Sequence, residues 1–220
     1  MAKIGVVLSG CGVYDGSEIH EAVITLLAID RLGAEAVCMA PDIEQMHVVN
    51  HLKGEPVAGE TRNVLVESAR IARGNIKDIA EVSAADVDAL IFPGGFGAAK
   101  NLCNFAVKGA DCEVNPEVAR LVQEIVAAQK PLAAVCIAPT LISRVLGDEK
   151  LAHQLTIGND SDTAAALTTM GSRHIDCPVR EFVIDKPNKL ITSPAYMLAG
   201  RISEAADGIE KTVKALIDLI

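Results

Sequence analysis

The segment Pro131–Thr140 constrains the fold of this chain more than any other. Residues 131–135 are a short, mostly apolar run that is typical of a buried strand. Cys136 follows at once, and Ala138-Pro139 then leads into a helical pattern over residues 141–146. A cysteine at the tip of a strand, between small residues and just before a helix, is typical of a nucleophile elbow. Such a turn holds the nucleophile in a sparsely allowed backbone conformation.

This segment alone is compatible with two interpretations of Cys136. The start of the following helix offers unpaired N–H groups and the positive end of a helix dipole, and both favour a reactive thiolate. A free cysteine is also often a buried structural residue. The order of the other elements therefore has to decide between a nucleophile and a core residue.

Composition excludes several classes of protein. Half of the 220 residues are hydrophobic and 22% are charged, which favours one folded domain over residues 1–220 with a sizeable core. The net charge of −9 argues against nucleic acid or an anionic membrane as a partner. The sequence shows no signal peptide and no apolar run long enough to span a bilayer, so we expect a cytoplasmic location. The six cysteines form no Cys-x-x-Cys pair, which favours free thiols over disulfides or a zinc site.

Strands and helices alternate along the chain. The expected strands lie at 3–9, 36–41, 76–82, 87–92, 131–135, 155–158, 179–185 and 189–193, and the first of them is a near-continuous apolar run. The expected helices lie at 17–32, 63–73, 117–128, 163–170 and 203–220. This alternation predicts an α/β fold with an open, mostly parallel sheet and helices on both of its faces. In such sheets, functional sites gather at the carboxyl ends of the strands.

Local signals add detail to this outline. A hairpin is expected over residues 48–57, around Lys53-Gly54. Ser17 is expected to cap the first helix. That helix carries an apolar stripe formed by Ile19, Val23, Leu26, Leu27 and Ile29.

Three strand ends carry the residues that suggest chemistry. Gly10–Glu21 follows the first strand, Pro93–Gly97 follows a central one, and Cys136 follows another. The glycines of Pro93–Gly97 allow a backbone to approach a ligand closely, with N–H groups exposed. Neither glycine-rich segment has the spacing of a nucleotide-binding loop. His47 and His51 have the spacing of helical metal ligands, but their surroundings favour solvated loop histidines, so no metal or cofactor is expected.

These residues resemble the ThiJ/PfpI superfamily, whose members have a class I glutamine amidotransferase-like, flavodoxin-like fold. In particular, the chain resembles the ElbB glyoxalase branch, also called sigma cross-reacting protein. The resemblance spans nearly the whole chain and rests on Ile4–Glu21, Pro93–Asn101, Val135–Pro139 and Thr192–Leu198.

The resemblance implies a role for each matching residue. Cys136 falls on the nucleophile of the elbow, and Glu21 falls on the acidic residue of the first helix that lies against the sulfur. Gly95 and Ile137 fall on the N–H donors of an oxyanion hole. A homodimer is implied by the resemblance alone.

One position departs from the family pattern. Many relatives carry a histidine where this chain has Asn159-Asp160, so the usual Cys-His pair is in doubt. Glutamine amidotransferases also need a His-x-Glu pair downstream of the cysteine, and the nearest imitation here is His174-Ile175-Asp176. Glutamine hydrolysis is therefore disfavoured. The residues that we expect to support the site from around it are His20, Asn159, Asp160 and Cys11.

A cysteine facing a carboxyl group suits chemistry on a small reactive aldehyde. The hypothesis is cofactor-free conversion of glyoxal to glycolate, or of methylglyoxal to lactate, through a hemithioacetal on Cys136. Glu21 would shuttle the proton, with a pKa raised by its neighbour. The alternative is a redox-sensing or partner-binding protein in which Cys136 is oxidised and aldehyde turnover is incidental. Repair of aldehyde-modified amines would use the same residues.

Overall fold

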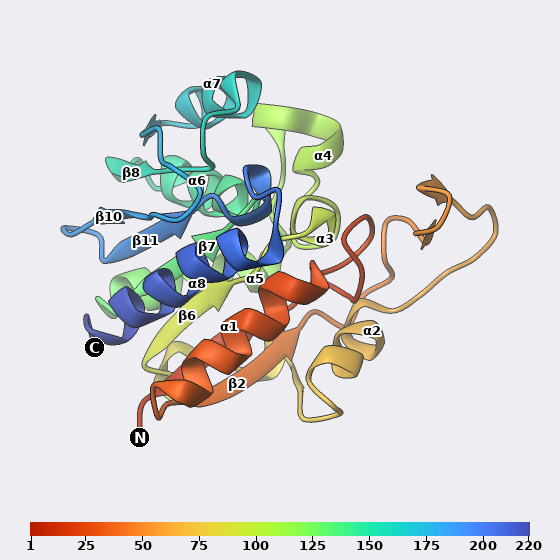
Figure 1. The fold of residues 1–220 in the computed structure, drawn as a ribbon, viewed down its shortest axis with the longest axis horizontal. Helices are drawn as coiled ribbons and strands as arrows, with labels where there is room; N and C mark the ends of the chain where they lie inside the picture. Colours follow the sequence, from red (N-terminus) through yellow and green to blue (C-terminus); the bar gives the residue numbers. More distant parts are fainter.

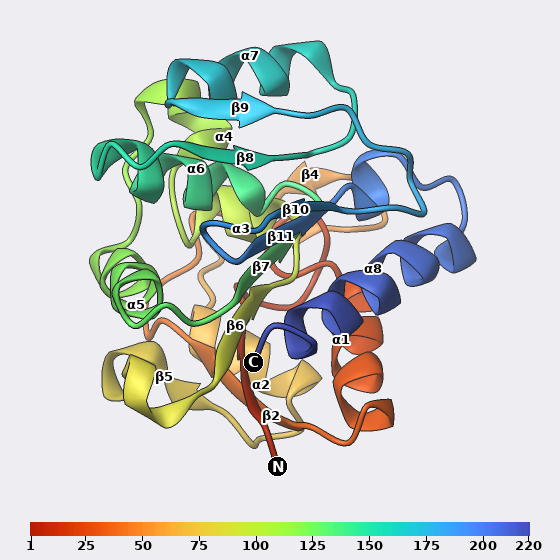
Figure 2. The ribbon, with the colours of Figure 1, turned by 90° about the vertical axis from the view of Figure 1, so that its left-hand side faces the viewer.

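A seven-stranded sheet forms the centre of the computed structural model, which describes all residues from Met1 to Ile220 (Figure 1, Figure 2). The strand order is β10-β11-β7-β6-β1-β2-β5. The strands are β1 (Lys3–Val7), β2 (Glu35–Ala40), β5 (Lys77–Asp78), β6 (Ala89–Phe92), β7 (Leu132–Val135), β10 (Val183–Asp185) and β11 (Leu190–Ser193). All neighbours pair in parallel except β10 and β11, which confirms the predicted open, mostly parallel α/β sheet.

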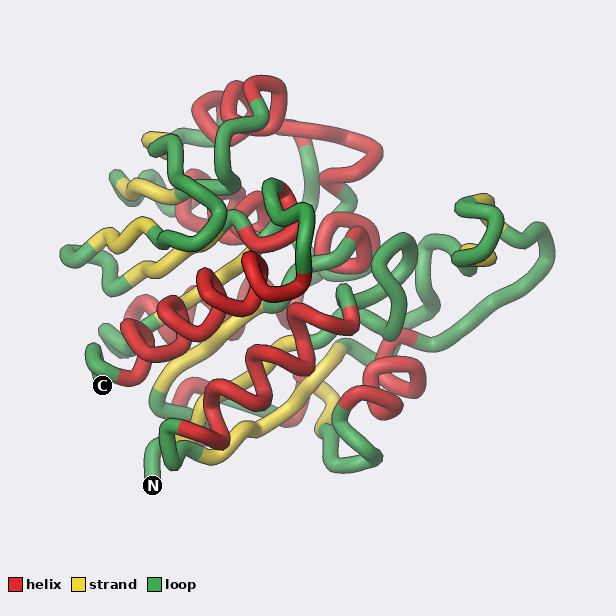
Figure 3. The backbone as a smooth tube through the Cα atoms, in the orientation of Figure 1, coloured by secondary structure: helices red, strands yellow, loops and turns green.

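Helices cover both faces of this sheet. One face carries α1 (Ile19–Arg31), α2 (Val64–Ile71) and α8 (Ile202–Ile217), and the other carries α5 (Pro116–Ala127) and α6 (Pro139–Asp148) (Figure 3). The strands divide their side chains between two cores: Val6 packs on the α1 and α8 side, and the next residue, Val7, packs on the other. That alternation explains why the strands read as continuous apolar runs.

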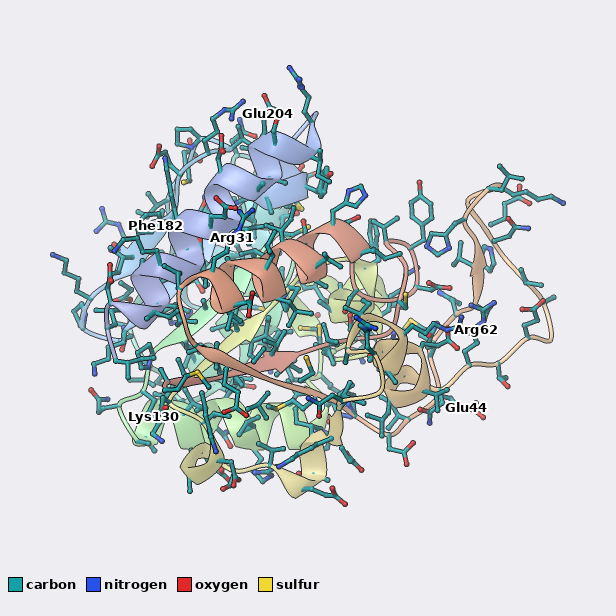
Figure 4. The ribbon with its side chains drawn as sticks, turned by 60° about the horizontal axis from the view of Figure 1, so that its bottom comes forward. Arg31, Glu44, Arg62, Lys130, Phe182 and Glu204 are labelled. Atoms are coloured by element: carbon teal, nitrogen blue, oxygen red, sulfur yellow. The ribbon has the colours of Figure 1, made fainter.

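The α1 and α8 helices lie side by side (Figure 1, Figure 4). Arg31, labelled in Figure 4, donates a hydrogen bond of 3.1 Å to Glu210 of α8. The apolar stripe predicted for α1 is only partly buried. Ile19, Val23 and Leu27 are exposed, whereas Ile29 is buried as predicted. The other side chains through which α1 meets the core are Ala22, Ile24 and Ala28.

The remaining elements lie beyond the sheet, at its carboxyl end and beside its edge strand β10. They are α3 (Phe96–Lys100), α4 (Phe105–Lys108), α7 (Ser161–Thr169) and a small parallel sheet of β8 (His153–Leu155) and β9 (Ser172–His174). The strand expected at 155–158 is therefore displaced towards the N-terminus, and the strand expected at 76–82 is limited to β5. No helix is long and apolar enough to cross a membrane.

Residues 44–63 form an arm that projects from the body of the molecule (Figure 1, Figure 3). The arm ends in the predicted hairpin, formed by β3 (Val49–Asn50) and β4 (Glu55–Pro56). Its two ends meet where the Gln45 N–H donates to the Arg62 carbonyl at 2.8 Å. Glu44 and Arg62 mark this base in Figure 4.

Asn101 joins the arm to the loop that follows β1. Its side-chain Nδ2 donates to the carbonyl oxygens of Ser9 and Asp15, each at 2.9 Å. Its Oδ1 accepts from the Met46 N–H at 2.9 Å. Asp15 adds a second link, since its Oδ2 accepts from the Val49 N–H at 2.7 Å. One buried amide therefore satisfies three backbone groups from two separate segments.

We expect Asn101→Asp to destabilise the fold by about 3 kcal/mol, because it replaces two donors with a carboxylate facing two carbonyl oxygens. Urea unfolding measures the loss. The matched control is Asn50→Asp at the hairpin turn, where only the Oδ1 acceptor is used. Equal stabilities for the two variants would contradict this role of Asn101.

Candidate active site

The site lies at the carboxyl ends of β1, β6, β7 and β11. The chain leaves β1 towards β2 on one side, while β6, β7 and β11 extend the sheet on the other. Connections that depart in opposite directions open a crevice at such a switch point. The three sequence segments predicted to meet, Gly10–Glu21, Pro93–Gly97 and Cys136, all border this crevice.

Cys136 occupies the predicted nucleophile elbow. Its φ of 62° lies in the left-handed region that side chains rarely adopt, as such a turn requires. The Cys136 N–H donates to the Ser193 carbonyl at 3.0 Å, which extends the pairing of β7 with β11 beyond the end of the strand. Pro139 opens α6 directly behind it. The elbow is therefore held by the sheet on one side and by a helix on the other.

Glu21 faces the sulfur from the first helix. Its side chain is fully buried, and Oε1 accepts from the Tyr196 N–H at 3.0 Å. Oε2 has no conventional hydrogen-bond partner and lies against Cys136 and Gly94. A Cβ built on Gly94 would lie 2.7 Å from Oε2 and 2.9 Å from the Cys136 Sγ. The carboxyl and the thiol therefore approach each other only because residue 94 has no side chain.

Burial sets the protonation of this pair. It raises the pKa of Glu21 to about 7, and the N–H groups of Tyr196 and Gly94 offset part of that effect. Burial and then the charge of Glu21 raise the pKa of the Cys136 thiol well above its ordinary value. The expectation of a thiolate stabilised at a helix N-terminus is therefore wrong. Glu21 titrates near neutral pH, and the sulfur keeps its proton.

The predicted oxyanion hole has two free donors. The N–H groups of Gly95 and Ile137 bond to no other backbone group, and both approach the Cys136 sulfur closely enough to lower its pKa. Gly95 has a φ of 98°, and a Cβ there would lie 2.3 Å from the Glu18 nitrogen. Only glycine fits this turn, which directs the N–H towards the sulfur.

A pocket of about 410 Å³ opens onto Cys136, whose exposed fraction is 8%. Most of its lining is apolar, and it contains no histidine. This chain has Asn159-Asp160 where a histidine would complete the usual Cys-His pair, and no histidine from another part of the chain lines the pocket in its place. The lining residues that bear oxygen on their side chains are Glu18, Asp160, Thr163 and Tyr196.

The four residues expected around the site have different positions. His20 lies outside the pocket lining, with its Nδ1 2.8 Å from the hydroxyl of the lining residue Tyr196. Asp160 lines the pocket but caps α7, accepting from the Thr163 N–H at 2.8 Å. Asn159 is exposed and outside the pocket lining. Cys11 lies elsewhere, and burial and the charge of Glu67 raise its pKa.

Sequence reasoning missed two residues of the site. Glu18, rather than Ser17, caps α1, since its Oε2 accepts from the Glu21 N–H at 2.7 Å. Ser17 is used differently, accepting from the Ser9 N–H at 2.9 Å. Tyr196 was visible only as part of the matching segment Thr192–Leu198, and its backbone contact with Glu21 has no sequence signal.

The pKa of Glu21 leads to a prediction about stability. A carboxyl with a higher pKa in the folded chain binds more protons when folded, so stability falls as the pH rises from about 4.5 to about 7. Glu21→Gln removes that slope. The free energy of unfolding of the variant, relative to that of wild type, should therefore rise by about 3 kcal/mol between pH 4.5 and about pH 7. Urea unfolding across this pH range measures the effect. Glu113→Gln, at an exposed carboxylate, is the control, and parallel curves for wild type and Glu21→Gln would contradict the assignment.

The raised pKa of the thiol predicts slow alkylation at neutral pH. We expect the rate of Cys136 modification by iodoacetamide to rise about tenfold per pH unit through neutrality, since the thiolate is the reacting form. Peptide mass spectrometry separates Cys136 from the partly exposed Cys11. A rate that levels off below pH 7 would show that the resting sulfur is a thiolate.

The chain is similar to curated proteins over nearly its full length, although no protein-family model matches it. A human protein named glutamine amidotransferase-like class 1 domain-containing protein 3, mitochondrial, is 48% identical over 99% of this chain and 83% of its own length. The rat ES1 protein homolog, mitochondrial, is 48% identical over 99% of this chain and 84% of its own length.

Solved structures agree with the fold. An isoprenoid biosynthesis protein with an amidotransferase-like domain from Ehrlichia chaffeensis superposes with a TM-score of 0.93 at 39% identity, over 100% of this chain and 99% of that one. Drosophila melanogaster DJ-1beta shares the fold with a TM-score of 0.56 at 19% identity, over 100% and 96% of the two chains. The narrower assignment to the ElbB branch stays a prediction.

The comparisons also correct the expected location. The human and rat relatives, and a Danio rerio relative that is 36% identical over 89% of this chain, are all named mitochondrial proteins. The prediction of a cytoplasmic location is therefore wrong. By identity and coverage, this chain belongs to the family of glutamine amidotransferase-like class 1 domain-containing proteins, the ES1 proteins.

Proposed function

We propose that this protein converts glyoxal to glycolate without a cofactor, and methylglyoxal to lactate by the same route. The observation that carries the proposal is the contact of the Cys136 thiol with a carboxyl whose pKa is about 7, beside two unpaired N–H groups. This arrangement supplies a nucleophile, a proton shuttle matched to neutral pH and a place for a developing negative charge.

The first step is addition of sulfur to one aldehyde carbon. Glu21 accepts the thiol proton as the S–C bond forms, so the high pKa of the free thiol does not prevent attack. The electron pair of the carbonyl moves to its oxygen, which the N–H groups of Gly95 and Ile137 hold. One such donor is commonly worth about 3 kcal/mol in the transition state. Glu21 then returns the proton to that oxygen, which gives a neutral hemithioacetal.

The second step converts the hemithioacetal into a thioester. Glu21 removes the hydrogen of the sulfur-bearing carbon and delivers it to the neighbouring carbon through an enediolate. Water then attacks the thioester, the C–S bond breaks, and the sulfur regains its proton as glycolate leaves. Glyoxal and one water are consumed, and no oxidant or reductant is needed.

The pocket argues against glutamine hydrolysis, in spite of the names of the relatives. That chemistry needs a histidine to activate the cysteine, and no histidine lines the pocket. His174 is held elsewhere, with Nε2 accepting from the Ile157 N–H at 3.4 Å. A carboxyl in direct contact with the sulfur replaces the histidine as the base.

The site also fits a peroxide sensor poorly. Oxidants attack thiolates, whereas burial and then the charge of Glu21 raise the pKa of the Cys136 thiol well above its ordinary value. An aldehyde small enough to enter the pocket meets the thiol together with its own base. The homodimer, and the lack of a nucleic-acid or membrane partner, stay predictions.

Glycolate formation tests the proposal directly. Wild-type protein incubated with glyoxal, without glutathione or added metal, should release one glycolate for each glyoxal consumed, as measured by chromatography. Cys136→Ala should abolish release because the nucleophile is lost. Glu21→Gln should lower kcat by at least about 100-fold because the proton shuttle is lost.

Two controls make this result specific. Cys38→Ala removes a thiol on β2, outside the pocket, and should retain wild-type turnover. Glutamate release from glutamine should be absent from wild type. Glyoxal consumption that persists in Cys136→Ala, or glutamine hydrolysis by wild type, would contradict the proposal.

A further inference from the structure

The isomerisation in the proposed function, on which this inference rests, moves two protons. One passes from carbon to carbon, which Glu21 performs. The other passes from the oxygen on the sulfur-bearing carbon to the oxygen on its neighbour. Backbone N–H groups can stabilise these oxygens, but they cannot exchange protons at neutral pH. A second acid–base group is therefore needed, and no histidine lines the pocket to supply it.

Of the four pocket residues with side-chain oxygen, three are poorly suited to this task. Glu18 is occupied as the cap of α1, and Asp160 as the cap of α7. The hydrogen bonds from Thr163 lower the pKa of Asp160, so it is a weak proton donor at neutral pH. The aliphatic hydroxyl of Thr163 is too weak an acid. Tyr196 remains, since a phenol is the most acidic of the hydroxyl side chains.

Tyr196 is fixed at both ends. Its backbone N–H donates to Glu21 Oε1 at 3.0 Å, which ties the residue to the acid that contacts the sulfur. Its hydroxyl lies 2.8 Å from His20 Nδ1, with the two ring centroids 5.8 Å apart. Tyr196 is also one of the residues that line the same pocket as Cys136.

His20 connects this hydroxyl to solvent. Its side chain is 52% exposed, and the Glu18 carboxylate lies 3.9 Å from Nδ1. Burial, and then the charges of Glu18 and Glu21, raise the pKa of Tyr196, so the phenol keeps its proton at rest. The order from pocket to solvent is therefore Tyr196 and then His20, with Glu18 beside the histidine.

We propose that Tyr196 is the second acid–base residue of this site and that His20 is the positioning residue that holds its hydroxyl in place through the 2.8 Å contact. As Glu21 removes the carbon-bound hydrogen, the C–H electron pair forms the C=C bond of the enediolate. The electron pair of the carbonyl on the neighbouring carbon moves to its oxygen, which takes the Tyr196 proton. The hydroxyl on the sulfur-bearing carbon then gives a proton to Tyr196 as the thioester carbonyl forms, so Tyr196 ends protonated, as it began.

Tyr196→Phe separates this role from a structural one, because the backbone N–H to Glu21 is kept and only the hydroxyl is lost. We expect kcat for glycolate formation to fall about 100-fold. Addition of glyoxal to Cys136 should persist, so the covalent adduct should accumulate in intact-protein mass spectra. Tyr14→Phe is the matched control, since Tyr14 is the other tyrosine of the chain, packs on His51 and lies outside the pocket.

His20→Ala tests the positioning of the Tyr196 hydroxyl independently. Its turnover should fall as well, and added imidazole should restore it, because the exposed position can admit the free base. Turnover of Tyr196→Phe at the wild-type rate would overturn the inference while leaving the proposed function standing. Loss of the adduct together with turnover in Tyr196→Phe would also overturn it, by showing a structural role. A wild-type protein that forms no glycolate would refute the proposed function and this inference with it.

Discussion

The contact between a buried carboxyl and a buried thiol is the interaction on which the rest of this structure depends. Neither group is favourable in its charged form at that depth, and the fold compensates with backbone donors instead of cations. Tyr196 and Gly94 offer N–H groups to the acid, while Gly95 and Ile137 offer theirs to the sulfur. A site built from backbone donors requires exact strand ends and turns, which the parallel sheet supplies.

In the proposed reaction, the Cys136 thiol is activated only while it attacks the substrate. A permanently ionised cysteine would react with many electrophiles and oxidants that reached it. A thiol that releases its proton to an adjacent base only while attacking discriminates in favour of molecules that enter the pocket. In the proposed reaction a histidine is not essential, because the carboxyl that would act as the base already touches the sulfur and has a pKa of about 7.

The sequence was most informative where one residue type determines local geometry. The small residues around Cys136 and the Pro139 behind it predicted the elbow, and the apolar runs predicted the parallel sheet. Glu21, Gly95 and Ile137 were identified through resemblance, because no periodicity brings α1 to the end of β7. The raised thiol pKa was missed, since it depends on how deeply distant segments bury the sulfur. The Tyr196 N–H contact was also missed, because it depends on a turn in which Ala195 has a φ of 43°.

Gly94 has a consequence for how this family can vary. The volume that a methyl group would need there is already occupied by Cys136 and Glu21, with the nearest atom, the Cys136 Cβ, at 2.4 Å. Positions 21, 94 and 136 therefore constrain one another sterically. Shortening the acid at 21 to aspartate would leave the Cys136 Cβ in place, so alanine at 94 would still clash with the residue that carries the thiol. Glycine at 94 is thus a requirement of any cysteine at the elbow with this backbone, whereas the apolar wall of the pocket carries no such restriction.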